Sequence, residues 1–238
     1  MTKYCNIKQN SSQAWLNAAD VERASGEELK LEDFRGSYCV GGIDLSRTTD
    51  LTACCAVIEK NKEFYCFFKF FLPSERISEA SERDSVPYSQ YVTKGWLQPS
   101  GDNFVDYEDC FAWFRSLVTD YEIYPLQVGY DRYSAQQLVT EMKSFGFHMD
   151  DVFQGRNLYP VLMEFEGLLK DKRIHIGDNA LIKIHMLNSA LKMDVEQNKG
   201  KLIKLAVTDH IDGMAALADA FTVRQKWYGE IGEQLKNQ

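Results

Sequence analysis

Apolar residues dominate three closely spaced runs between residues 38 and 71, and short polar segments separate them. The first run, YCVGGID at 38–44, carries no charge before its final aspartate, which is typical of a strand buried on both faces. The runs at 52–59 and 63–71 flank the polar triplet Lys60-Asn61-Lys62, which predicts a tight hairpin turn. The pattern predicts an antiparallel meander whose first strand lies in the interior of a sheet.

The hydrophobic period changes after residue 105. A helical pattern at 107–121 leads into a strand at 126–130, and a second helix at 134–145 leads into a strand at 148–153. This alternation favours parallel pairing through right-handed crossovers. The remaining predicted elements are a helix at 13–24, an irregular excursion at 72–105 with a short helix at 88–93, a helix at 158–170, a brief strand at 173–176, a helix from 179, a hairpin of 193–197 with 201–207, and a last helix at 210–228.

Together these elements predict an α/β fold. It consists of a mixed five-stranded sheet in the order 3-2-1-4-5, flanked by helices, with an extra β-hairpin before the last helix. With 238 residues, of which 45% are hydrophobic, the chain can bury a sizeable core in one elaborated domain.

The composition of the chain predicts the cellular compartment of the protein. No run of about 18 apolar residues is present, and the start MTKYCNIKQN lacks the apolar stretch of a signal peptide, so we expect no membrane partner and no secretion. The six cysteines include no CxxC pair, and several lie in apolar runs. We interpret them as reduced core residues of a cytosolic protein.

The formal net charge of −8 argues at first against a nucleic-acid partner. The charge is uneven, because residues 36–150 carry ten basic and 17 acidic side chains, whereas residues 151–238 carry 12 of each. A concentration of carboxylates can mark a divalent-cation site, although a solvated acidic surface is the commoner explanation. Charge alone therefore decides neither the partner nor the chemistry.

Three aspartates occupy comparable places in the predicted fold. Asp44 and Asp131 each end a strand, and Asp212 lies in the first turn of the last helix. The strands at 38–44 and 126–130 would be parallel neighbours, so their carboxylates would emerge at one edge of the sheet, where ligands gather in open α/β folds. Three crowded carboxylates repel one another unless a cation lies among them. The pattern predicts one or two Mg²⁺ or Mn²⁺ ions, which could support phosphodiester cleavage.

Each of these aspartates also has a structural interpretation when it is taken alone. Asp44 could be a turn residue, Asp131 could cap the helix that follows it, and Asp212 could be a first-turn acid favoured by the helix dipole. The coincidence of all three with one topology favours the metal site.

Other polar residues lie close to these positions along the chain. Asp50, Asp209 and His210 could form an outer shell of the site, with turn and cap roles as the alternatives. Asp219 follows Asp212 by seven residues, so it should point the same way but lie too far along the helix to share a metal.

At these residues the chain resembles a known family, the nuclease domain of the large terminase subunit of tailed bacteriophages, which has an RNase H-like fold. The matching segments cover nearly the whole chain from residue 38. They are GGIDLSRTTDLTA at 41–53, GYDRYSAQQL at 129–138, the hairpin KMDVEQNKGKLIKL at 192–205, and HIDGMAALADAF at 210–221.

The resemblance implies a metal-dependent endonuclease that cuts concatemeric viral DNA at the start and end of genome packaging. Asp44, Asp131 and Asp212 match the metal-binding, catalytic acids of that family. Double-stranded DNA would then contact basic residues of the hairpin and its surroundings with little sequence preference and strong salt dependence. These residues are Arg132, Lys192, Lys199, Lys201 and Lys204. A hairpin that is only solvated is the alternative for the lysines, and Arg132 could pair with the carboxylates instead of holding a phosphate.

The resemblance also implies a domain division. Residues 1–36 look like a linker or arm from an ATPase motor, and residues 37–238 look like the nuclease domain. No GxxxxGK[ST] phosphate-binding loop occurs, so the motor itself is not expected in this chain. The full-length protein would work with its motor domain, the portal and the small terminase subunit in the host cytoplasm.

Two other readings stay open at this point. The segment GGIDLSRTTDLTACCAV also resembles the first phosphate loop of actin-like ATPases and sugar kinases, but those folds need two such domains and a glycine-rich adenosine motif. A catalytically inactive module that docks on other packaging proteins is the second alternative.

Overall fold

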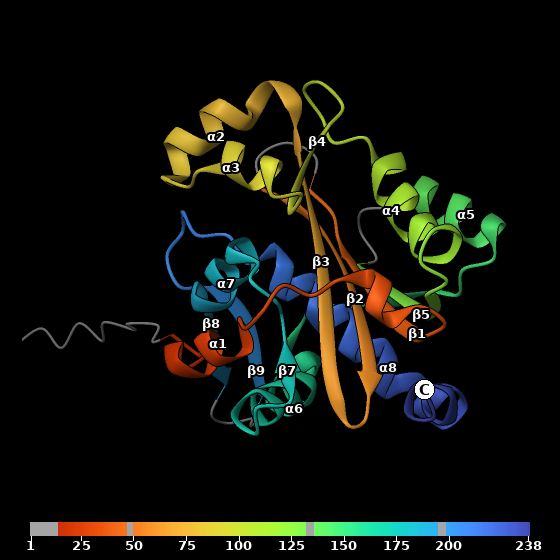
Figure 1. The fold of residues 1–238 in the computed structure, drawn as a ribbon. Helices are drawn as coiled ribbons and strands as arrows, with labels where there is room; N and C mark the ends of the chain where they lie inside the picture. Colours follow the sequence, from red (N-terminus) through yellow and green to blue (C-terminus); the bar gives the residue numbers. More distant parts are fainter. Residues whose placement is uncertain (1–13, 47–49, 132–135, 195–198) are drawn as a thin grey trace, which may run out of the picture.

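The computed structural model describes residues 14–46, 50–131, 136–194 and 199–238. A mixed seven-stranded sheet runs through the centre of the described chain, with the order β4-β3-β2-β1-β5-β6 and with β7 paired to β3 (Figure 1). The strand β1 pairs antiparallel with β2 and parallel with β5. The strands of this sheet are β1 (Tyr38–Asp44), β2 (Thr52–Lys60), β3 (Glu63–Pro73), β4 (Leu97–Ser100), β5 (Tyr124–Asp131), β6 (Met149–Val152) and β7 (Ile174–His175).

The predicted order 3-2-1-4-5 is confirmed for β3, β2, β1, β5 and β6. The short helix predicted at 88–93 is confirmed as α3 (Tyr88–Thr93). The prediction that the rest of 72–105 is irregular is wrong, because this segment also forms η2 (Ser74–Arg76), α2 (Ile77–Asp84) and the edge strand β4. Helix α2 has 8 residues, is mostly polar and buries Ala80, and β4 is four residues long and contains Pro99, so neither forms an apolar run that stands out in the sequence.

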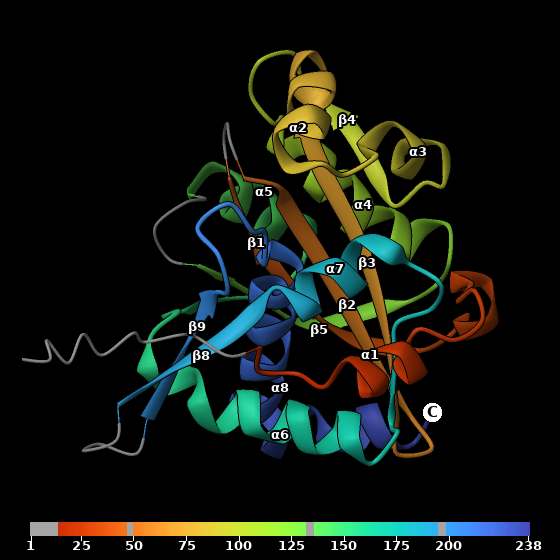
Figure 2. The same ribbon diagram turned by 90° about the vertical axis from the view of Figure 1, so that its left-hand side faces the viewer.

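Helices cover both faces of the sheet. On one face, α4 (Tyr107–Thr119) and α5 (Gln136–Phe145) enclose one apolar core. On the other face, the long α8 (Asp212–Lys236) lies directly on β1, β2 and β5 (Figure 2). The remaining helical elements are α1 (Ala18–Ala24), η1 (Leu31–Phe34), η3 (Arg156–Leu158), α6 (Tyr159–Lys170) and α7 (Ala180–Leu187).

Two glycines allow α8 to approach the sheet closely. A Cβ atom on Gly42 of β1 would lie 1.9 Å from the carbonyl oxygen of Ala216 and 2.7 Å from the backbone nitrogen of Ala220. A Cβ atom on Gly129 of β5 would lie 2.5 Å from the carbonyl oxygen of Asp219. The backbone of α8 therefore rests on the backbone of two strands, which only residues without a side chain permit. This contact fixes the start of α8 near the ends of β1 and β5.

The hairpin before α8 is present, but it begins earlier than predicted. Its strands are β8 (Ser189–Asp194) and β9 (Lys199–Lys204), which form a separate two-stranded sheet. The residues that open β8, Ser189 and Ala190, are buried and give no alternating pattern.

The N-terminal arm packs on this same side of the domain over its described part. The backbone N–H of Trp15 donates to the carbonyl oxygen of Ser189, and Ala14 pairs with Ala190. Helix α1 is shorter than predicted because Asn17 caps it, its side chain accepting a hydrogen bond from the N–H of Ala19. In the parts of the chain that the structure describes, no helix has both the length and the apolar character that crossing a membrane requires.

Candidate active site

The three aspartates singled out from the sequence meet at one edge of the sheet. Asp44 ends β1 and Asp131 ends β5, and the parallel register pairs the residues just before them, Ile43 and Tyr130. Asp212 is the first residue of α8 and is 6% exposed. Burial, followed by the charges of Asp212 and Asp131, raises the pKa of Asp44 well above its ordinary value. The structure thus brings these carboxyl groups close enough to repel one another.

A glutamine and a fourth aspartate lie beneath this group. The Nε2 atom of Gln154 donates to Oδ2 of Asp219 at 3.0 Å, and the same side chain hydrogen-bonds to Asp44. Asp219 is fully buried, and burial, followed by the charge of Asp44, raises its pKa well above the ordinary value. The Oδ1 atom of Asp219 has no hydrogen-bond partner among the described residues, which fits a protonated carboxyl group. Asp219 therefore holds Gln154, which in turn contacts Asp44.

A histidine faces the same carboxylates from the other side. One ligand atom each from Asp50, His210 and Asp212 lies within 4.8 Å of the others. The Nδ1 atom of His210 is 3.3 Å from Oδ1 of Asp50 and 3.5 Å from Oδ2 of Asp212. Burial opposes a charge on His210, but the carboxyl groups of Asp212 and Asp50 outweigh it and raise its pKa to about 9.

The other ring nitrogen of His210 is held by helix α2. Its Nε2 atom is 3.0 Å from Oδ2 of Asp84, a carboxylate that also accepts from the Tyr88 hydroxyl at 3.0 Å and from Nε of Arg83 at 2.6 Å. An acceptor at Nε2 places a proton there and leaves Nδ1 to face Asp50 and Asp212. Asp84 therefore sets the orientation of His210 toward the site.

The donor set fits a divalent cation. The Nδ1 atom of His210 and Oδ2 of Asp212 are both buried without a hydrogen-bond partner in the described parts of the chain. Carboxylate oxygens are the ligands that Mg²⁺ and Mn²⁺ prefer, and an imidazole nitrogen is compatible with the latter. With its pKa raised to about 9, His210 carries a proton on Nδ1 at pH 7, and this proton faces Asp50 and Asp212. A divalent cation bound to Nδ1 would take the place of that proton.

A second histidine anchors the start of α8. The backbone N–H of Gly213 donates to Nδ1 of His185 at 3.0 Å, whereas the cap residue Ile211 offers no side-chain hydrogen bond. Burial lowers the pKa of His185 to about 4, so the ring is a neutral acceptor at pH 7. His185 thus performs the capping role and holds Asp212 in place.

The other predicted site residues have different surroundings. Asp209 accepts a hydrogen bond from the N–H of Ala206 at 2.7 Å, which is a turn interaction. Lys204 donates to Asp50 at 2.9 Å. The interaction of Asp50 with His210, and after it this contact with Lys204, holds the pKa of Asp50 below its ordinary value. Lys192 is exposed on β8, and Arg132 lies outside the described residues.

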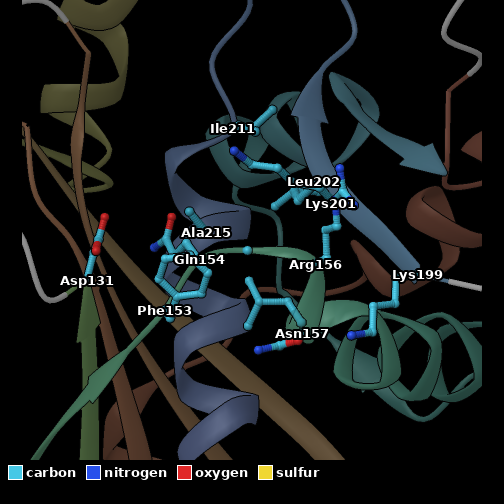
Figure 3. A pocket seen from close by; sticks show the side chains of 12 residues that line it. Asp131, Phe153, Gln154, Arg156, Asn157, Lys199, Lys201, Leu202, Ile211 and Ala215 are labelled. Atoms are coloured by element: carbon cyan, nitrogen blue, oxygen red, sulfur yellow. The ribbon is translucent and has the colours of Figure 1, made fainter. Parts of the chain in front are cut away.

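A cavity of about 800 Å³ opens beside Asp131. The loop after β6, strand β9 and the first turns of α8 form its walls (Figure 3). Lys199 and Lys201, both expected to contact DNA, line this cavity and are exposed.

Sequence reasoning missed Asp84, Gln154 and His185 as parts of the site, and it placed Asp219 on the same side of the last helix as Asp212 without giving it a role. A carboxylate in the apolar helical stretch 214–221 was a usable signal for Asp219, because a buried charge needs a reason. The other three carry no local signal, since their partners lie far away in the sequence.

A mixed sheet with acidic side chains at the ends of two adjacent parallel strands, completed by the first turn of the last helix, defines the class of RNase H-like nucleases. The family described as "Terminase large subunit, endonuclease domain" matches residues 1–226, and the chain belongs to this family. The match confirms the resemblance expected from the sequence.

Individual relatives agree with this assignment. The large terminase subunit of Enterobacteria phage HK97 is 26% identical over 197 residues, which are 81% of this chain and 38% of that protein. The crystal structure of the HK97 large terminase superposes with a TM-score of 0.77 at 22% identity and covers 89% of this chain and 43% of that one. The nuclease of thermophilic phage G20c with bound magnesium has a TM-score of 0.53 at 11% identity, covering 88% of this chain and 98% of that one. The chain thus spans less than half the length of the HK97 protein that it matches.

Proposed function

We propose that this protein is a divalent-metal-dependent endodeoxyribonuclease that cuts concatemeric phage DNA during genome packaging, with little sequence specificity. The observation that carries the proposal is the convergence of Asp44, Asp131 and Asp212 at one sheet edge, in a member of the terminase endonuclease family. The bound magnesium of the G20c relative supports the choice of metal.

In this proposal Asp44, Asp131 and Asp212 hold Mg²⁺ or Mn²⁺, with Asp50 and His210 beside them. A bound divalent ion supplies Lewis-acid polarisation of the phosphodiester and activation of a water molecule. Gln154 fixes the carboxylate of Asp44 through its hydrogen bond. His185, through the N–H of Gly213, keeps Asp212 at the start of α8.

We further propose that the complete packaging protein joins this domain to an ATPase motor and works with the portal and the small terminase subunit in the host cytoplasm. The greater length of the HK97 relative, of which the match covers 38%, supports a longer complete protein. In that arrangement residues 1–36 form the arm that leads to the motor, and residues 37–238 form the nuclease.

The direct test is cleavage of supercoiled plasmid. We expect nicked and then linear product with Mn²⁺ or Mg²⁺ and none with EDTA, because the crowded carboxylates need a cation to act.

Thermal unfolding gives a second test, which measures metal binding without cleavage. Mn²⁺ at about 100 times its dissociation constant should add about 2.7 kcal/mol to the free energy of unfolding, and Asp212→Asn should lose this gain. A protein that binds ATP in calorimetry, is not stabilised by Mn²⁺ and does not cleave would favour the kinase-like alternative instead.

The hairpin lysines yield a prediction about DNA binding. Lys199→Ala and Lys201→Ala should each weaken duplex binding at low salt and reduce the slope of log affinity against log salt by about 0.9, because each lysine neutralises about one phosphate. Fluorescence anisotropy with duplexes of different sequence measures both effects. Lys94→Ala, at an exposed position before β4, is the control. An unchanged slope in both hairpin variants would remove these lysines from the DNA contact.

A further inference from the structure

The cavity beside Asp131 has two chemical characters. Its interior presents the apolar side chains of Phe153, Leu158 and Leu202, together with Ile211 and Ala215 of the α8 segment. Basic side chains of Arg156, Lys199 and Lys201 also line it (Figure 3). Its volume of about 800 Å³ is in the range of sites that enclose a small molecule, about 300–1,000 Å³.

A tight turn places one aromatic ring in this cavity. The N–H of Gly155 donates to the carbonyl oxygen of Phe153 at 2.8 Å, which closes a three-residue turn. The ring of Phe153 lies against Gly155, where an added Cβ atom would be 2.3 Å from its Cε1 atom. Phe153 is nevertheless 49% exposed. The turn therefore presents a large apolar surface at the cavity instead of burying it.

The same turn connects the cavity with the acidic group. Gln154 is the central residue of the turn, and it hydrogen-bonds to Asp219 and Asp44. Its neighbour Phe153 lines the cavity, as does Asp131. A ligand in the cavity consequently lies next to the carboxylates that would hold the metal.

The basic side chains that line the cavity come from two segments that contact each other. Arg156 forms an ion pair with Asp194 of β8 at 2.5 Å, which ties the loop after β6 to the hairpin. Lys199 and Lys201 reach the cavity from β9. Cations alone would suit the backbone of a duplex, but they do not explain an apolar hollow with an exposed ring. A nucleotide whose base is unstacked offers both an aromatic face and a phosphate.

We propose that this cavity binds one unpaired nucleotide of the DNA strand that reaches Asp131, with its base stacked on Phe153 and its phosphate near Arg156 and Lys201. The proposal rests on the proposed nuclease function for the identity of the substrate. It implies that the strand is locally unpaired next to the cut, so that frayed, gapped or single-stranded DNA binds this subsite better than intact duplex does.

The test uses an oligonucleotide that carries the fluorescent base 2-aminopurine, with Ca²⁺ replacing Mg²⁺ to prevent cleavage. Phe153→Ala should weaken binding of the single strand about tenfold, because stacking on an aromatic side chain is lost, and it should abolish quenching of the probe. Phe153→Trp should retain both the single-strand affinity and the quenching of the probe. Phe104→Ala removes another exposed aromatic ring, which is outside the residues that line the cavity, and should change neither.

Intact duplex serves as the comparison ligand. We expect the affinity of Phe153→Ala for duplex to lie within about twofold of that of the unchanged protein. Equal single-strand affinity of the two proteins, or an equal loss for single strand and duplex, would overturn the subsite. If the binding results overturned the subsite while the protein still cleaved plasmid with a divalent metal, the nuclease proposal would stand. If Phe153 stacked on the base but the protein cleaved no DNA, only the nuclease proposal would be contradicted.

Discussion

Replacing Asp44 with asparagine should reduce metal-dependent cleavage of supercoiled plasmid by about a thousandfold or more. A metal ligand at the reacting phosphate is worth several kcal/mol of transition-state stabilisation, and each 1.36 kcal/mol changes the rate tenfold. Asparagine keeps the shape of the side chain but removes the charge that Asp44 contributes between Asp131 and Asp212. Initial rates in Mn²⁺, measured under single-turnover conditions, give the ratio.

The same variant should fold at least as well as the unchanged protein in EDTA. The pKa of Asp44 is raised in the folded chain, so charging this group costs stability as the pH rises from its ordinary value of 3.8 through its folded pKa. Asparagine removes this cost, and thermal unfolding at pH 7 measures the gain. Asp102→Asn, at an exposed turn, should alter neither cleavage nor stability. Undiminished cleavage by a pure Asp44→Asn preparation would refute the role of Asp44.

The part of the site that could be predicted consists of residues at the ends of secondary-structure elements. Asp44 and Asp131 are visible because each follows an apolar run, and parallel pairing places strand ends together. Asp212 is visible because it opens a long helix. In these cases a local pattern and one topological rule are enough to place the side chain.

The supporting residues follow no such rule. Asp84 contacts His210 across 126 positions, and Gln154 contacts Asp219 across 65. Asp84 also lies in the segment that was predicted to be irregular, so no element was available to orient it. Side-chain partners that meet only through tertiary packing leave no period in the sequence, and a single sequence does not reveal them.

The role of the glycines of β1 could be predicted only in part. The pair Gly41-Gly42 is conspicuous within an apolar strand, and glycine there indicates close approach of another backbone. The sequence does not say which element approaches. The structure identifies α8, whose residues Ala216 and Ala220 are both fully buried against the strand. The alanine-rich start of this helix is the complementary half of the same contact.

Gly42→Ala should therefore lower the free energy of unfolding by about 3 kcal/mol or more. The new methyl group would lie 1.9 Å from the carbonyl oxygen of Ala216, and backbone on both sides leaves little room to adjust. Displacement of α8 would also move Asp212 away from Asp44, so the stabilisation by Mn²⁺ should shrink in any protein that still folds. Urea denaturation with and without Mn²⁺ measures both effects.

Gly167→Ala is the matched control for this substitution. Gly167 is exposed within α6, and an added Cβ atom there would have no described atom within 4 Å other than those of its chain neighbours and of the helix's own backbone. Alanine has the better helix propensity, so this variant should gain about 0.5–1 kcal/mol. If Gly42→Ala instead unfolded at the urea concentration of the unchanged protein and kept its full response to Mn²⁺, the contact between α8 and β1 would not be what positions Asp212. The geometry of the metal site would then have to come from the cap at His185 alone.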